Sequence, residues 1–187
     1  MKVIFCNIAY MKSYCGDEND TPVNGGKYIA ENKDGGEVYN FLEYDGRCYG
    51  YFMYYGDMVH IERIEDNGRN TVDNVLVVWV AKPDKPDSHS VIVGWYKNAT
   101  VYRYSQTNLS YRYGIYRDYN IVADAKNCYL LPENKRNFII PRASKSGKGK
   151  GMGQSPIWYA DSEYAKKEFV PKVLEYIENY EKMMVNL

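Results

Sequence analysis

Histidine is scarce in this chain, and its scarcity limits the enzymes that the chain could be. The 187 residues include only two histidines, His60 and His89. Neither belongs to a Ser/His/Asp or Cys/His pattern of the kind that activates a nucleophile. The carboxylates form no nuclease signature. We therefore predict a binding protein with no catalytic residues, and a metal-dependent nuclease with an unrecognised site is the alternative.

Closely spaced cysteines are also missing. The four cysteines contain no Cys-x-x-Cys pair, and only two histidines could join them as ligands. Structural zinc needs four such ligands in close spacing. We expect four free thiols, mostly buried, with no metal site and no cofactor.

Long apolar runs are absent as well. No stretch approaches the roughly 20 residues that a membrane helix needs. The first seven residues are too short and too soon polar for a signal peptide. We expect a cytoplasmic protein that does not act at a membrane.

What is present is tyrosine, with 21 residues against 5 phenylalanines. The overall composition, 26% charged and 45% hydrophobic, is typical of soluble globular chains, and the length suits one domain. Tyrosine combines a large apolar face with a polar tip. The chain could therefore line wet grooves with rings as well as fill a core.

Charge is balanced in total but unevenly spread. Between residues 97 and 150, eleven lysines and arginines face only three acids, whereas the net charge of the chain is zero. Segregation of this kind is typical of a nucleic-acid-binding face. A scatter of solvated charges is the alternative.

The stretch from residue 90 to residue 103 carries the most information. The β-branched run 91–93 and the alternating run 99–102 predict two strands joined by a bend. At the bend, the rings of Trp95 and Tyr96 would lie beside the donors of Lys97 and Asn98, which suits a planar ligand such as a base. A ring pair packed in the core beside a hairpin turn would explain the same residues.

Further strands are expected from apolar runs. They cover residues 2–10, 38–42, 47–53, 58–64, 75–80, 121–123, 128–131 and 138–140. Asp45-Gly46 predicts a hairpin turn. The run 75–80 is the most hydrophobic in the chain and predicts the central strand, with Trp79 in the core.

The stretch 142–155 is rich in glycine and lysine. Glycines allow backbone amides to approach a phosphate, and Arg142, Lys145, Lys148 and Lys150 supply positive charge. The spacing is not that of a P-loop. We interpret the stretch as a flexible loop that binds the nucleic-acid backbone, with a plain disordered loop as the alternative.

The C-terminal end is predicted to be helical. Ser162 is a plausible N-cap, and Pro171 would kink the helix or start a second one. The apolar face at helical spacing comprises Ala165, Phe169, Val173, Ile177, Tyr180 and Met184. This face would cover the sheet, or else contact another domain or subunit.

Several stretches together resemble a family of prokaryotic domains. The longest are Val-Ile-Val-Gly-Trp-Tyr-Lys-Asn-Ala-Thr-Val-Tyr-Arg at 91–103 and Gly-Met-Gly-Gln-Ser-x-x-Trp-Tyr-Ala at 151–160. Domains of this family occur alone or joined to HNH nucleases and other restriction modules. The expected short-strand barrel and ring-lined bend are also similar to the PUA-like superfamily, which includes EVE, YTH, ASCH and SRA domains. This resemblance implies a reader of modified bases that holds an extruded base between aromatic rings.

We therefore predict an α+β fold. Its core would be a curved or partly closed mixed sheet, a PUA-like barrel, with a C-terminal helix. Residues 1–160 would form the PUA-like β-rich domain, and residues 161–187 would form a helical segment packed on it.

The predicted function is the reading of a modified base in duplex DNA, in restriction or phage defence, with a nuclease or helicase as a protein partner. The residues predicted to bind the base are Trp95, Tyr96, Asn98, Gln154 and Trp158. Those predicted to bind phosphate are Lys97, Arg103, Arg142, Lys145, Lys148 and Lys150. A protein-interaction module of a defence system is the alternative outside nucleic-acid binding.

Overall fold

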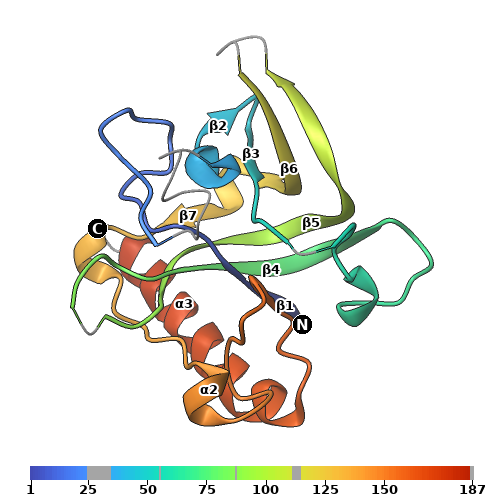
Figure 1. The fold of residues 1–187 in the computed structure, drawn as a ribbon, viewed down its shortest axis with the longest axis vertical. Coiled ribbons are helices and arrows are strands. Elements are labelled where there is room, and N and C mark those ends of the chain that lie inside the picture. Colours follow the sequence, from blue (N-terminus) through green and yellow to red (C-terminus); the bar gives the residue numbers. More distant parts are fainter. Residues whose placement is uncertain (25–34, 55, 87, 111–114, 186–187) are drawn as a thin grey trace.

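The computed structural model describes residues 1–24, 35–54, 56–86, 88–110 and 115–185 (Figure 1). The strands are β1 (Lys2–Asn7), β2 (Glu43–Tyr44), β3 (Arg47–Gly50), β4 (Thr71–Ala81), β5 (Val91–Ser110), β6 (Ile115–Asp124), β7 (Cys128–Leu130) and β8 (Ile157–Trp158). The helices are α2 (Ala143–Ser146) and α3 (Val170–Val185), with a π-helical turn, η6 (Ala165–Phe169), before α3. Short 3₁₀ turns are η1 (Gly36–Tyr39), η2 (Ile61–Arg63), η4 (Ala125–Asn127) and η5 (Glu133–Lys135).

All eight described strands belong to one mixed sheet. The order is β2-β3-β6-β5-β4-β1-β8, and β7 pairs with β5 beside this path. β1 runs parallel to β4, and the other pairs are antiparallel. The predicted α+β class, with a mixed sheet and a C-terminal helix, is confirmed, and the sheet does not close on itself within the described strands.

The sheet separates two apolar cores. The first core holds Trp79 and Tyr96, and the second core, under α3, holds Phe5 and Trp95. Along β4, Val75, Val77 and Trp79 face the first core, and the residues between them face the second. A strand buried on both faces reads as a continuous hydrophobic run, so the run 75–80 indicates an interior strand. The middle of the strand order is β5, however, and β4 lies next to it.

The C-terminal helix covers the second core, as predicted. The amide of Ala165 donates to the Ser162 side chain at 3.1 Å, which confirms the expected N-cap. Pro171 is the second residue of α3, just past the π-helical turn η6, and the helix continues beyond it to Val185. The expected apolar face is buried except for Met184, which is 55% exposed.

The predicted bend at 94–98 is wrong, because β5 is one continuous strand of 20 residues. Val75 pairs with Ala99 and Val77 pairs with Tyr96, so two residues of β5 oppose one residue of β4. This arrangement is a β-bulge, in which Asn98 has a φ of +52°. The bulge changes which residues face each core without turning the chain.

Other predicted strands also differ. Residues 38–42 contain the end of η1, residues 58–64 contain η2, and residues 138–140 contribute one isolated bridge, between Ile139 and Val91. The hairpin at Asp45-Gly46 is confirmed, since both residues have positive φ, of 50° and 73°. None of the helices in the described ranges is long and apolar enough to cross a bilayer.

Candidate phosphate-binding cleft

The ring pair predicted to hold a base is part of the cores. Trp95 and Tyr96 are each 0% exposed. As neighbours on one strand they point to opposite faces of the sheet, Trp95 into the second core and Tyr96 into the first. Trp95 packs between Tyr129 and Tyr180, at 5.7 Å between ring centroids in each case. Neither ring offers a face to a ligand, so the predicted stacking role is corrected to core packing.

The other predicted base contacts are dispersed. Trp158 is 7% exposed and stacks on Phe5, with centroids 4.9 Å apart, so it too is a core residue. Asn98 lies at the bulge of β5, and Gln154 lies in the turn before β8. Both are exposed, but neither lines the cleft described below.

Two predicted phosphate contacts are already engaged in ion pairs. Lys97 pairs with Glu181 of α3, whose other oxygen accepts the Trp95 indole N–H at 3.1 Å. Arg103 pairs with Glu62 at 2.7 Å. Hydrogen bonds from its own backbone amide, from His60 and from Arg103 lower the pKa of Glu62 to about 2, so this carboxylate is charged at neutral pH.

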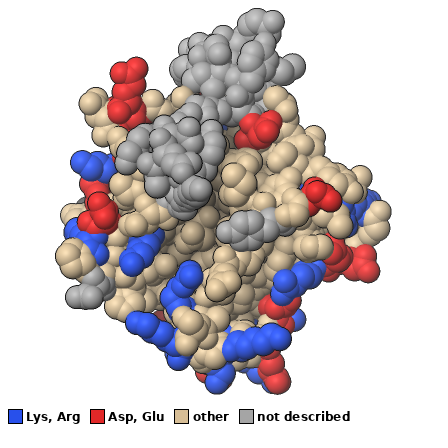
Figure 2. Space-filling model, in the orientation of Figure 1, with Lys and Arg blue, Asp and Glu red and all other residues tan. Residues whose placement is uncertain are grey.

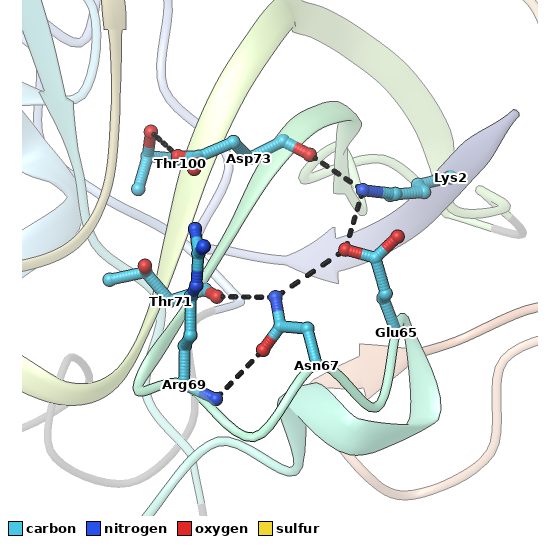
Figure 3. A network of polar contacts seen from close by, with 7 residues as sticks. All are labelled: Lys2, Glu65, Asn67, Arg69, Thr71, Asp73 and Thr100. Carbon is cyan, nitrogen blue, oxygen red and sulfur yellow. Dashed lines mark hydrogen bonds and ion pairs between the residues drawn. The ribbon is translucent and has the colours of Figure 1, made fainter.

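Other cations serve the fold in the same way. Arg136 is buried and donates to the backbone carbonyls of Leu131, Met11 and Lys12. Figure 3 shows Lys2 bound to Glu65 at 2.8 Å and to the carbonyl of Asp73 at 3.1 Å. The basic residues of this protein therefore differ in whether their charge is free to bind a ligand or is already used in a contact within the fold.

The glycine-rich stretch is folded rather than loose. The amide of Ala143 donates to Met152 at 2.8 Å, and the amide of Met152 donates to Pro141 at 2.9 Å. At Gly151 a Cβ would lie 2.3 Å from the Pro141 carbonyl oxygen, so the close approach of the two segments requires glycine. The stretch expected to be a flexible loop instead forms a short helix, α2, and a turn that is hydrogen-bonded back to the start of this helix and to Pro141.

A cleft of about 750 Å³ lies between the β4–β5 connection and the segment that leads into α2. Lys82, Arg142 and Lys145 supply positive charge to its lining. The other lining residues that the structure describes are polar or apolar and include no aspartate or glutamate: Asn7, Asn24, Ser88, His89, Ser90, Ile139, Ile140, Pro141 and Ser146. None of the three cations forms an ion pair within the described parts of the chain.

Both walls of the cleft are held by hydrogen bonds. Asn24 donates through its side-chain amide to the carbonyl of Lys82 at 3.0 Å, and Ser88 donates to the carbonyl of Pro83 at 2.7 Å. On the opposite wall, the amide of Ile140 donates to the carbonyl of Ser90 at 2.8 Å. Ile140 is buried, so it anchors the segment that carries Arg142.

The chemistry of this lining favours an anion with several oxygens. Three cations without an ion pair among the described residues give a positive potential, and the hydroxyl, amide and imidazole groups add hydrogen-bond donors. Figure 2 shows that Lys and Arg gather over the lower part of the molecule in that view, where Figure 1 places α2 and α3. Lys148 and Lys150 are exposed on the turn after α2 and extend the charge beyond the cleft.

The structure thus joins two of the six predicted phosphate residues, Arg142 and Lys145, in one site. The sequence did not single out Lys82, Asn7 or Asn24, although Lys82 directly follows the most hydrophobic strand. Within the described ranges, no group of three or more His, Cys, Asp or Glu side chains is arranged to hold a metal ion. Comparisons with protein-family models, curated proteins and solved structures gave no match.

Proposed function

We propose that this protein binds nucleic acid and that the cleft holds the phosphate backbone. One observation carries the proposal: Lys82, Arg142 and Lys145 line a single cleft, and none of the other described residues that line it is a carboxylate. Phosphate contacts supply most of the affinity of such proteins and fix their register on the strand. The exposed Lys148 and Lys150 would continue the contact along the backbone.

The preferred ligand in this proposal is duplex DNA with a modified base, in the cytoplasm, as part of restriction or phage defence. This choice, and membership of the PUA-like superfamily, rest on the sequence resemblance, with which the curved mixed sheet is consistent. Because Trp95, Tyr96 and Trp158 are buried, the side chains that read the base would have to lie at the cleft. Asn7 is suited to this role, since a side-chain amide can pair with the edge of adenine.

A second candidate is a protein-interaction module. A row of four half-buried tyrosines crosses β2, β3, β6 and β5 in the order Tyr44, Tyr49, Tyr119 and Tyr102. The ring centroids of successive members are 6.4, 5.0 and 5.7 Å apart. Tyr49 follows Cys48, which faces the first core, so this row lies on the outer face. Tyrosine is enriched at protein interfaces.

Fluorescence anisotropy distinguishes the two candidates. Labelled duplexes with cytosine, 5-methylcytosine, 5-hydroxymethylcytosine or N6-methyladenine, and a single strand, are titrated with the wild type and two variants. The cleft variant carries Lys82→Ala, Arg142→Ala and Lys145→Ala. The control variant loses the same charge at exposed cations outside the cleft, through Arg47→Ala, Arg69→Ala and Lys126→Ala.

We expect the cleft variant to lose most of its affinity and the control variant to keep it. A preference for one modified duplex would support base reading. Equal losses in both variants would reduce the effect to net charge and contradict the role of the cleft. No binding of any nucleic acid by the wild type would overturn the proposal and leave the interaction module.

A further inference from the structure

A second cavity lies apart from the cleft, at the opposite end of β1. Asn7 at the end of β1 lines the cleft, whereas Lys2 and Val3 at its start line a groove of about 470 Å³. The end of η2, the segment after β8 and the helical segment formed by η6 and α3 complete the described lining of the groove. The two cavities share none of their described lining residues, so the groove is a separate candidate site.

The floor of the groove is aliphatic. Ile64, Val170 and Leu174 line it, and each of them is only partly buried, so apolar surface remains open to a ligand. Val170 and Leu174 are four residues apart and therefore lie on one face of the helix. Phe169 and Val173, which belong to the neighbouring face, are buried in the second core. The C-terminal helix thus covers the core with one apolar face and offers a second one to the groove.

The backbone around the groove is irregular in two places. The π-helical turn η6 contains the lining residue Lys166 and is followed directly by Val170. Ala160, in the segment after β8, is buried and has a φ of +49°, a left-handed conformation that alanine rarely adopts. Both π-helical turns and strained backbone are frequent at functional sites. The two irregularities border the same groove, which favours a role in binding.

The rim of the groove carries positive charge. Lys166 is exposed, and its side chain forms no ion pair or hydrogen bond within the described parts of the chain. The guanidinium of Arg63 lies over the Tyr159 ring, 4.2 Å from its centroid. Its Nε and Nη2 donate to one oxygen of Asp161 at 3.0 and 2.6 Å, which leaves Nη1 for another acceptor. Lys2 is already bound to Glu65 (Figure 3). A ligand would therefore meet an aliphatic floor and two cationic donors, those of Lys166 and Arg63.

We propose that this groove binds an aliphatic carboxylate, such as a fatty acid of medium chain length. The chain lies on Ile64, Val170 and Leu174, and the carboxylate accepts hydrogen bonds from Lys166 and from Nη1 of Arg63. Sites for small molecules typically have volumes of about 300–1,000 Å³, with mostly apolar walls and a few polar groups, and the groove fits this description. Burial of the chain supplies affinity, and the charge-assisted contacts select an anionic head group.

Isothermal titration calorimetry of the full chain with sodium decanoate, kept below the concentration at which it forms micelles, tests the proposal. Butanoate has the same head group and a short chain, and decyltrimethylammonium has the same chain and the opposite charge. We expect saturable binding of one decanoate per chain and binding of the other two probes that is weaker by roughly tenfold or more. Equal binding of decanoate and decyltrimethylammonium, or no saturable binding of decanoate, would overturn the proposal.

Two matched pairs of variants test the two parts of the site. Lys166→Ala should weaken decanoate binding roughly fivefold, as expected for one partly exposed charge-assisted contact. Its control is Lys167→Ala, since Lys167 is exposed and pairs with Glu163 outside the groove. Leu174→Ala should weaken binding roughly tenfold, and Met184→Ala, on an exposed part of the same helix, should not. Circular dichroism checks that each variant folds. Equal losses within either pair would contradict the assignment.

Chemical shift changes in ¹H–¹⁵N spectra locate the bound decanoate. We expect them at Ile64, Lys166 and Leu174 and not at Arg142 or Lys145. Changes confined to the cleft would place the carboxylate at the phosphate site and overturn the proposal. The triple cleft variant should bind decanoate as the wild type does, so this test does not depend on nucleic-acid binding.

Discussion

Two regions of this protein carry basic residues that differ in whether their charge is free to bind a ligand. Along β5, Lys97 follows Trp95 and Tyr96, Arg103 follows Tyr102, and each of the two cations is paired with a carboxylate. At the cleft, Lys82, Arg142 and Lys145 have no such partner among the described carboxylates. The difference comes from acids that are distant in the chain, since Glu181 is 84 positions from Lys97 and Glu62 is 41 positions from Arg103. A basic residue beside aromatic rings therefore does not by itself indicate a ligand-binding residue. An acid that is distant in the chain can form an ion pair with it and neutralise its charge.

The largest effect is expected at Trp95. Trp95→Ala should lower the free energy of unfolding by about 3–5 kcal/mol, because it removes a fully buried ring from the second core and leaves Glu181 without its indole donor. Urea denaturation measures it, and Trp95→Phe should cost less. A variant of unchanged stability that loses ligand binding would show that the ring belongs to a site after all.

The next prediction compares two arginines. Arg142→Ala should weaken nucleic-acid binding roughly tenfold, as expected for the loss of one charge-assisted contact. Arg103→Ala should change affinity by less than about twofold, because Glu62 already neutralises the guanidinium. Anisotropy at one salt concentration compares them, and the reverse order of effects would assign the binding face to β5.

A smaller effect is expected from breaking the ion pair of α3. Lys97→Met keeps most of the side-chain length and should lower stability by about 1 kcal/mol or less, since the lysine is 36% exposed and the pair is partly screened by solvent. Chemical denaturation at low and high salt measures the change. A loss that does not shrink as salt rises would contradict an electrostatic origin.

The smallest effect is the titration of Glu62. Its pKa is lowered from the ordinary 4.5 to about 2, so its contribution to stability is present above pH 4.5 and is lost as the pH falls towards 2. The carboxyl resonance in an NMR titration should show the low midpoint, and Arg103→Gln should raise it. A midpoint that does not move in Arg103→Gln would mean that the ion pair does not form in solution.

Much of the fold could be predicted from local patterns. The run 75–80 indicates an interior strand, because burial on both faces leaves a continuous apolar pattern. Asp45-Gly46 and Ser162 marked a hairpin and a helix start through turn and capping chemistry. These features depend on residues close together in the chain, which is why the sequence revealed them.

The features that could not be predicted depend on distant contacts. Gly94 suggested a bend, but it is present because a Cβ there would lie 2.4 Å from the Tyr129 carbonyl oxygen of β7. Trp95 and Tyr96 lie in a continuous strand with one ring in each core, and the bulge at Asn98 follows them without turning the chain. The cleft brings residues of the β4–β5 connection close to α2. No local pattern in the sequence predicts that these two segments are neighbours.

The salt dependence of DNA affinity is the sharpest test of whether the cleft binds phosphate. The logarithm of the binding constant is plotted against the logarithm of salt concentration for the wild type, the triple cleft variant and the double variant Lys97→Ala, Arg103→Ala. Each lost phosphate contact lowers the slope by about 0.9. We predict a slope smaller by roughly 2.7 for the cleft variant and an unchanged slope for the double variant. An unchanged slope in the cleft variant, with a reduced slope in the double variant, would contradict this prediction.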